Sequence, residues 1–308
     1  MNKPKILVIG SLNMDLILQT TVMPIAGENL IGSHYQYAHG GKGGNQAIAA
    51  AKLGADVTFV GKVGQDAFGD ELVASLSEHG ISTKFITRDA KSNTGLATII
   101  LEEKGQNRIL VYPEANMTLT TAEIDKAFEG QDYDAMMIQF EIPEAVVIHA
   151  CEKAREKGIP FIVDAGPAQD FPLEKILGAE IFSPNETETF ALCQIEVTDL
   201  KSAEIAAKML FKRCEAKYIV IKAGGFGAYI YDSETSTHIP ALRVAAIDPT
   251  AAGDAFTAGM TVEYLQDNNI EKAVMYANGV GAVTVTKLGA QPSIPTRQEV
   301  EEFLKGRA

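Results

Sequence analysis

The chain has 308 residues, of which 46% are hydrophobic and 22% are charged, and its formal net charge at pH 7 is −13. This composition is typical of a globular protein with a substantial core, and the negative charge disfavours nucleic acids and anionic membranes as partners because both would be repelled. No run of about 18 apolar residues is present, and Cys151, Cys193 and Cys214 are too scattered for a disulfide framework or a zinc knuckle, so we expect a cytoplasmic protein.

Short β-rich runs alternate with helical patterns along most of the chain. The predicted strands are Ile6–Ile9, Val57–Val60, Met136–Gln139, Phe161–Asp164, Ile181–Ser183 and Tyr218–Lys222. The predicted helices, with apolar residues at three- and four-residue spacing, are Asn45–Leu53, Leu72–Glu78, Ala145–Lys157, Ala203–Cys214, Gly253 to about Asp267, Glu271 to about Thr286, and Arg297–Leu304. This alternation predicts one α/β domain over residues 1–308, in three layers, with helices on both faces of a mostly parallel central sheet.

Two regions interrupt the alternation. Gly32–His39 and Gly95–Tyr112 look like strands without helices between them, and Glu103-Lys-Gly-Gln106 is a plausible hairpin turn. We expect a small β-sheet lid set apart from the main sheet and built from about residues 12–18, 32–39 and 94–112. Such a lid would suit a site that excludes water, whereas an edge meander of the main sheet is the alternative.

The first chemically unusual residues follow the first strand. Asn13 and Asp15 are two apart, so in an extended segment both side chains point the same way and can hold vicinal sugar hydroxyls, although an Asx turn explains them equally well. In Gly40-Gly-Lys-Gly-Gly-Asn45, four glycines allow the backbone to approach a ligand closely, while Lys42 and Asn45 offer donors. The alternative is a flexible turn before a helix.

Further polar residues are expected at the carboxyl edge of the sheet, where ligands bind in open α/β folds. Glu141 follows one predicted strand, and Asn185 and Glu188 follow another, although these two residues also fit a helix capping pattern. Gly224-Gly-Phe-Gly227 is either a nucleotide shelf or a hairpin turn leading into Ala228–Tyr231.

The most informative stretch is Asp248-Pro-Thr-Ala-Ala-Gly-Asp-Ala-Phe256. An Ala-Ala-Gly turn that opens onto an apolar helix leaves backbone N–H groups without partners beside the carboxylate of Asp254. Those amides would stabilise a phosphoryl group in transfer while Asp254 accepts a hydroxyl proton. The alternative is that Asp254 merely caps a helix that starts at Gly253.

Two of these stretches, Gly40–Asn45 and Asp248–Phe256, lie more than 200 residues apart. Together they resemble the paired signatures of the ribokinase (PfkB) carbohydrate kinase family. The resemblance runs from about residue 4 to 305. It also includes Gly10-Ser-Leu-Asn-Met-Asp15, Gln139-Phe-Glu141, Pro184-Asn-Glu186 and Lys287-Leu-Gly-Ala-Gln-Pro-Ser293.

The resemblance implies a phosphotransferase with an alcohol acceptor that phosphorylates D-ribose at O5 with ATP. Asp254 would be the general base, and Ala252 and Gly253 would supply the amides of the anion hole. The implied sugar-binding residues are Asn13, Asp15, Gly41, Lys42, Asn45, Glu141 and Asp254. A kinase for another sugar or nucleoside, such as 2-deoxyribose, is the nearest alternative, and a non-catalytic sugar or nucleotide sensor is a further one.

The resemblance also implies cofactors and an assembly. Glu188 would position Mg²⁺ through water, and the lid would pair with its twin in a homodimer. The implied nucleotide-binding residues are Asn185, Lys222, Gly224, Gly225, Gly227, Gly253 and Asn278. The implied ligands of an activating monovalent cation, K⁺, are Asp248, Thr250, Thr284, Lys287, Gly289 and Ser293. Lys222 and Gly225 depart from the family pattern, which often has a small or hydroxyl residue there, and Lys222 is a candidate for direct contact with the nucleotide phosphates.

Overall fold

A computed structural model describes residues 3–103 and 106–307. Its main sheet contains, in spatial order, β13 (Ser236–Ile239), β12 (Ala228–Tyr231), β11 (Tyr218–Lys222), β10 (Ile181–Ser183), β9 (Phe161–Asp164), β8 (Ala135–Gln139), β1 (Lys5–Ile9), β4 (Asp56–Gly64) and β5 (Ser82–Asp89). The strands from β11 to β5 are parallel, and β12 and β13 are antiparallel additions at one edge. The prediction of a mostly parallel sheet is confirmed.

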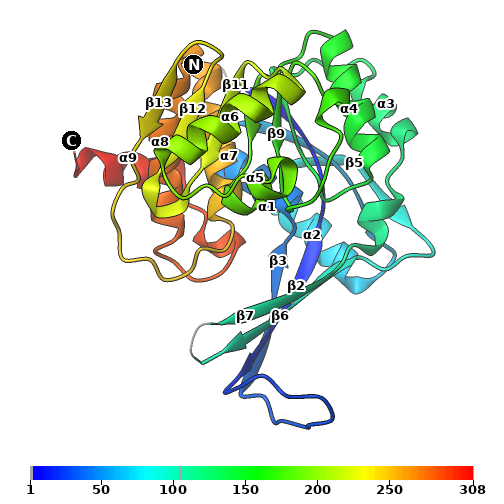
Figure 1. Cartoon of the computed structure of the whole chain (residues 1–308). Helices are drawn as coiled ribbons and strands as arrows, with labels where there is room; N and C mark the ends of the chain where they lie inside the picture. Colours follow the sequence, from blue (N-terminus) through cyan, green and yellow to red (C-terminus); the bar gives the residue numbers. More distant parts are fainter. Residues whose placement is uncertain (1–2, 104–105, 308) are drawn as a thin grey trace.

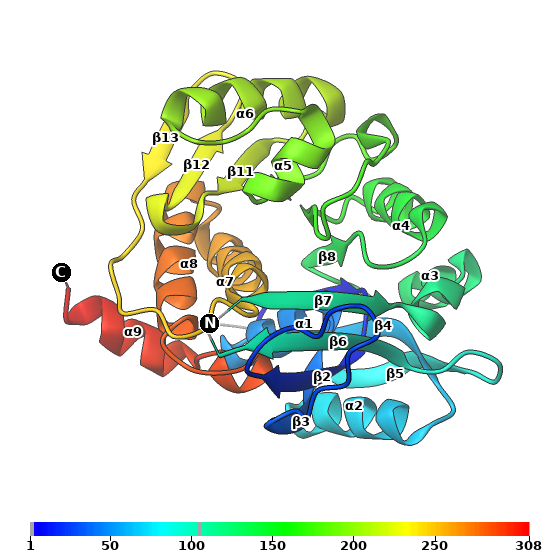
Figure 2. The same cartoon turned by 60° about the horizontal axis from the view of Figure 1, so that its bottom comes forward.

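Helices cover both faces of this sheet (Figures 1 and 2). One face carries α1 (Lys42–Lys52), α2 (Ala67–Glu78), α7 (Ala252–Asp267), α8 (Ile270–Thr284) and α9 (Arg297–Lys305). The other face carries α3 (Thr121–Phe128), α4 (Glu144–Glu156), α5 (Glu186–Cys193) and α6 (Leu200–Cys214). In β1, Ile6 and Val8 belong to the first apolar cluster and Leu7 and Ile9 to the second, as expected for a strand that is buried on both sides.

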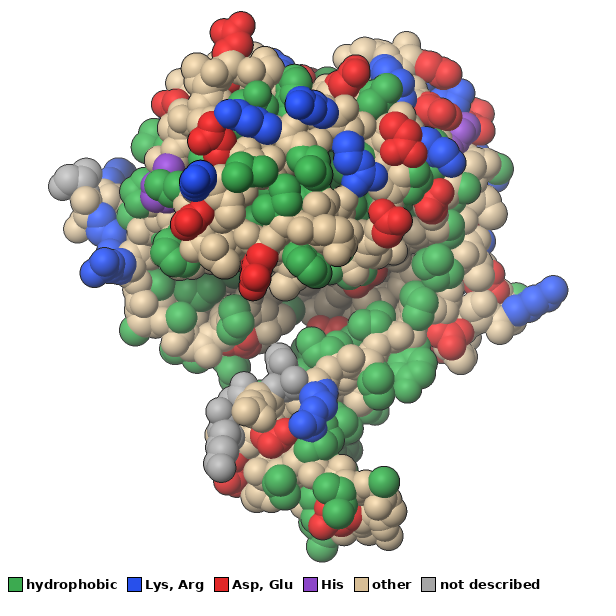
Figure 3. Space-filling view, viewed as in Figure 1, with side chains coloured by type: hydrophobic (Ala, Val, Ile, Leu, Met, Phe, Trp, Pro, Cys, Tyr) green, Lys and Arg blue, Asp and Glu red, His purple; other side chains and the backbone are tan. Residues whose placement is uncertain are grey.

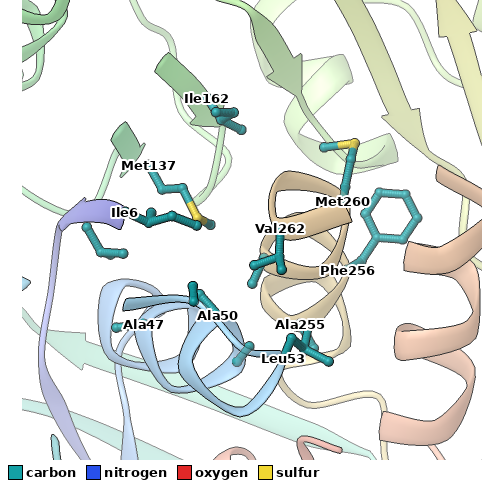
Figure 4. Close-up of a cluster of buried hydrophobic side chains, with 14 of the residues drawn as sticks. Ile6, Ala47, Ala50, Leu53, Met137, Ile162, Ala255, Phe256, Met260 and Val262 are labelled. Carbon is teal, nitrogen blue, oxygen red and sulfur yellow. The ribbon is translucent and has the colours of Figure 1, made fainter. Parts of the chain in front are cut away.

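The packing of α1 against α7 positions the site. Figure 4 shows Ala47 and Ala50 of α1 beside Ala255 of α7, with Ile6 and Met137 of the sheet above them. Because the facing side chains are small, the two helices approach closely, and the removal of their apolar surface from water stabilises that approach. The amino-terminal turns of α1 and α7 are therefore held near each other.

The predicted lid is a separate four-stranded sheet. Its spatial order is β3 (His34–Gly40), β2 (Asn13–Thr20), β6 (Gly95–Glu102) and β7 (Asn107–Tyr112). β2 pairs antiparallel with β3 and parallel with β6, and β6 pairs antiparallel with β7. Figure 1 shows this sheet projecting from the body, so the alternative of an edge meander is wrong. Lys104 and Gly105 of the predicted hairpin turn lie outside the described residues.

Among the helices of the described chain, none is both long and apolar enough to cross a membrane.

Candidate active site

Polar side chains gather where the parallel strands of the main sheet end. Ser11 follows β1, Glu141 follows β8, Asp164 ends β9, and Asn185 and Lys222 lie at the ends of β10 and β11. β1 is also the point at which the strand order reverses, because β4 lies on one side of it and β8 on the other. Ligands of open α/β sheets bind at such a point, and Figure 3 shows the surface hollowed between the body and the lid.

The turn before α7 matches only part of the predicted anion hole, because one of the two predicted amides is already hydrogen-bonded within the protein. The helix begins at Ala252, and Ala251 before it has a left-handed backbone (φ 59°) and no capping side chain. The amides of Gly253 and Asp254 donate to no protein acceptor within the described residues, whereas the Ala252 amide donates to the Pro249 carbonyl at 3.1 Å. The free donors in this structure are therefore the amides of Gly253 and Asp254.

Asp254 does not cap the helix, so the capping alternative is wrong. Its carboxylate lies in the first turn of α7, only 6% exposed, and accepts hydrogen bonds from Asn45 Nδ2 at 2.9 Å and Gln46 Nε2 at 3.4 Å. Burial raises the pKa of Asp254 to about 6, with Lys42 opposing and Asp164 reinforcing that rise. At neutral pH the group is largely ionised yet more basic than an ordinary aspartate, which suits a general base.

Asn13 and Asp15 lie side by side on the same face of β2, facing the site. Both are buried within a regular strand that pairs on both sides, so the Asx-turn alternative is wrong. Burial, followed by the charges of Glu141 and Asp254, raises the pKa of Asp15 to about 7. Asn116, which was not predicted from the sequence, donates to Asn13 Oδ1 at 2.8 Å and fixes the orientation of that amide.

The glycine-rich stretch forms the beginning of α1 rather than a flexible turn. Gly41 has φ +85°, and a Cβ there would lie 2.7 Å from the amide nitrogen of Asn13, so only glycine fits this close crossing. The Lys42 amide donates to Glu141 Oε2 at 3.2 Å, and Ser11 Oγ donates to the same oxygen. Asn45 Oδ1 is buried without a partner in the described chain, as expected of an acceptor that awaits a ligand.

The capping pattern at the start of α5 is confirmed. Asn185 Oδ1 accepts from the Glu188 amide at 2.9 Å, and Glu188 Oε2 accepts from the Asn185 amide at 2.7 Å. The second carboxylate oxygen, Glu188 Oε1, lies 3.9 Å from Lys42 Nζ. Burial raises the pKa of Glu188, although Lys222 and Lys42 oppose the rise. Glu188 therefore combines a structural role with a position in the site.

The glycines near 225 form the turn between β11 and β12, as the hairpin alternative predicted. Gly227 has φ +99°, and a Cβ there would lie 2.1 Å from the Ile239 carbonyl oxygen, whereas Gly224 and Gly225 are less crowded. Asn278 of α8 donates to the Pro240 carbonyl at 3.1 Å. A role of these residues in nucleotide binding stays a prediction.

Lys222 is paired inside the protein. Its Nζ lies 3.0 Å from Asp164 Oδ2, and both side chains are buried. Burial tends to raise the pKa of Asp164, but Lys222 and Lys42 outweigh it and hold the pKa below the usual value. Asp164 was missed as a site residue, although it ends a predicted strand at the same edge as Glu141.

The predicted cation ligands lie on segments that the fold brings together. The amides of Ile247 and Asp248 donate to the Val285 carbonyl at 2.7 and 3.1 Å, and the Gly289 amide donates to Asp248 Oδ2 at 2.9 Å. The remaining side chains donate to acceptors within the protein: Thr250 to Asp248, Thr284 to the Val280 carbonyl, Ser293 to the Ala290 carbonyl and Lys287 to Glu299. In the part of the chain that the structure describes, no group of three or more His, Cys, Asp or Glu side chains could hold a metal.

Comparison with known proteins identifies the family of this site. The profile of the pfkB family carbohydrate kinases matches residues 3–297. The ribokinase of Bacillus subtilis is 37% identical over 300 residues (97% of this chain and 99% of that protein), and the deoxyribokinase of Salmonella typhi is 34% identical over 301 residues (97% and 98%). The structure of Arabidopsis thaliana ribokinase complexed with ribose and ATP superimposes with a TM-score of 0.89 at 28% identity and covers 99% of each chain. The chain therefore belongs to the pfkB family of carbohydrate kinases and is a ribokinase-type member of it.

Proposed function

We propose that this kinase transfers the γ-phosphoryl group of ATP to the 5-hydroxyl of D-ribose. The observation that carries the proposal is the buried Asp254, whose pKa is raised to about 6, at a helix start with two free amides. The similarity to the Arabidopsis ribokinase complexed with ribose and ATP supports the choice of both substrates.

In this mechanism, Asp254 accepts the proton of the sugar hydroxyl as that oxygen bonds to the γ-phosphorus. The bond between the γ-phosphorus and the bridging oxygen breaks on the opposite side, and ADP leaves with the electron pair. The amides of Gly253 and Asp254 and the dipole of α7 stabilise the charge on the transferring group, and Lys42 adds a positive charge nearby. Closure of the lid over the sugar would exclude water.

The sugar would be held by Asn13, Asp15, Asn45 and Glu141, which together offer carboxylate and amide groups to several hydroxyls. The partnerless Asn45 Oδ1 supports this assignment because a sugar hydroxyl would satisfy it. We assign the secondary hydroxyls to Asn13 and Asp15. A sugar without the 2-hydroxyl would then leave a buried polar group unpaired, which costs about 1–3 kcal/mol.

A coupled assay of ADP formation with a panel of sugars tests the proposal. We expect ribose to be the best substrate and kcat/KM for 2-deoxyribose to be about tenfold to a hundredfold lower, which corresponds to that cost at 1.4 kcal/mol per factor of ten. If 2-deoxyribose is preferred, the ribose assignment is wrong. If no sugar stimulates ADP formation while the protein binds ribose, the non-catalytic sensor is the correct reading.

The same assay, repeated without Mg²⁺ or without K⁺, tests the proposed metal ions. The residues fit Mg²⁺ held mainly by the nucleotide phosphates, because Glu188 offers only a single carboxylate and Mg²⁺ keeps several waters. The adjoining segments that contain Asp248, Thr284 and Gly289 fit an oxygen-coordinated K⁺, which would order the turn before α7. We expect no turnover after chelation of Mg²⁺ and lower kcat when K⁺ is replaced by tetramethylammonium. Full activity in that buffer would contradict the K⁺ assignment.

We further propose that the lid pairs with the lid of a second copy. Large apolar side chains are exposed along its strands: Tyr35, Tyr37, Ile109, Leu110, Val111 and Tyr112. Figure 3 shows apolar side chains over much of the lid surface. Exposed apolar area of this kind indicates an interaction surface. Sedimentation equilibrium should give twice the 33.0 kDa mass of one chain, and a monomer at micromolar concentration would contradict the proposal.

A further inference from the structure

Next to the proposed base, Asp254, lies a buried ion pair whose two residues end strands of the main sheet. Asp164 at the end of β9 and Lys222 at the end of β11 are 1% and 10% exposed at their side chains. Asp164 Oδ2 accepts three hydrogen bonds, from Lys222 Nζ at 3.0 Å, from Thr257 Oγ1 at 2.8 Å and from Gln46 Nε2 at 3.0 Å. A carboxylate oxygen that accepts three hydrogen bonds is held firmly in one position.

Two of these donors, Gln46 and Thr257, connect the ion pair to the first turn of α7. Gln46 Nε2 also donates to Asp254 Oδ1 at 3.4 Å, so one amide group bridges the two carboxylates. The orientation of that amide is set at its other end, because Gln46 Oε1 accepts from Gln139 Nε2 at 2.7 Å. Thr257 lies one turn after Asp254 on α7, and its hydroxyl is also 3.1 Å from the Gly253 carbonyl oxygen. The pair thus contacts the supports of both the base and the anion hole.

We propose that the Asp164–Lys222 ion pair is a positioning device for phosphoryl transfer, which aligns Asp254 through Gln46 and the Gly253 turn through Thr257. The proposal rests on the proposed function, in which Asp254 is the base. It assigns Lys222 an internal role in place of direct contact with the nucleotide phosphates.

The pair also balances charge near the base. The charged groups around Asp254 come from several elements: Lys42 on α1, Asp15 on β2, Glu141 after β8, Asp164 on β9, Glu188 on α5 and Lys222 on β11. Asp164 acts to raise the pKa of Asp254 and Lys222 acts to lower it. Loss of either partner alone therefore leaves the other uncompensated, and the two losses act on Asp254 in opposite directions.

The test compares Lys222→Met, Asp164→Asn and the double variant by the pH dependence of the phosphoryl-transfer rate at saturating ribose and ATP. Saturation matters because burial also raises the pKa of Asp15 in the free enzyme, to about 7. Lys222→Met should move the acid limb of the profile to higher pH by roughly one unit, and Asp164→Asn should move it to lower pH. The double variant should return the limb toward that of the wild type. Each single variant should also lower the plateau rate, with little change in ribose affinity measured without ATP.

Three outcomes would overturn the inference. Unchanged acid limbs in both single variants would reduce the pair to a structural contact. Limbs that move in the same direction would contradict the charge argument. A large rise in KM for ATP in Lys222→Met alone, with the limb in place, would make Lys222 a phosphate ligand instead. Sugar-dependent ADP formation by the wild type tests the proposed function separately from all three.

Controls address folding. Lys62 and Glu123 form another partly buried pair at 3.2 Å, and neither is among the groups with the largest effect on the pKa of Asp254. Lys62→Met should lower the thermal unfolding temperature without moving the acid limb. If either single variant fails to fold, the double variant, which leaves neither charge unpaired, still tests the inference: loss of the positioning contacts should lower its plateau rate, and a wild-type plateau rate would contradict the proposal.

Discussion

Asp254→Asn should lower the rate of phosphoryl transfer by about 10²–10⁴-fold, the usual contribution of a general base. The asparagine has nearly the same shape but cannot accept the hydroxyl proton. Because Asn45 and Gln46 each donate to a different oxygen of Asp254, one of these donors would face the new NH₂ group. That mismatch should cost about 1–3 kcal/mol of stability, partly offset because a charge is no longer buried. Single-turnover kinetics and isothermal titration with ribose would separate the two effects.

The expected signature is a loss of rate with ribose affinity changed by less than about tenfold, a difference of 1.4 kcal/mol. Asp125→Asn is a matched control, because Asp125 is a partly exposed carboxylate on α3 that pairs with His149. It should leave the rate unchanged. A transfer rate in Asp254→Asn within a factor of ten of the wild type would remove Asp254 from the role of base.

Elements with a strong pattern were predictable from the sequence, and the missed ones have weak patterns. The buried strand β9 and the amphipathic helix α6 match their predicted ranges closely. By contrast, β5 was missed because it is only partly buried and carries charged residues, so its alternation is irregular. The short helix α3 has only eight residues, which is too few for a clear helical period.

The site residues, too, fall into those that the sequence could predict and those that it could not. Asn13, Lys42 and Asp254 could be found because each lies in a local stretch with unusual composition. Gln46 and Asp164 could not, because their roles arise from contacts across the fold: the hydrogen bond between them joins residues 118 positions apart. In the sequence, Gln46 is one more residue of a predicted helix and Asp164 is the last residue of a strand. The departure of Lys222 from the family pattern was the available signal, and its partner became visible only in the structure.

Gly43→Ala should lower both stability and activity, although alanine ordinarily favours a helix more than glycine does. Gly43 lies in the first turn of α1, where alanine would normally be favoured by about 1 kcal/mol. A Cβ at this position would lie 2.7 Å from Gly10 C and Ser11 N, which are backbone atoms of the segment between β1 and β2. The start of α1 would have to move, so we expect a loss of about 1–3 kcal/mol in the free energy of unfolding.

The same displacement would move Lys42 and Asn45 relative to Asp254, and misplacement by about 1 Å can cost about 10²-fold in rate. Chemical denaturation and steady-state kinetics of Gly43→Ala measure the two effects. Gly281→Ala in α8 is the matched control, because the nearest atom to its added Cβ is 3.8 Å away and helix propensity should then prevail. If both variants gain stability, the close crossing of α1 over the end of β1 does not constrain the site. If only Gly281→Ala does, the glycine-rich stretch is required by packing between α1 and the sheet as well as by access to the ligand.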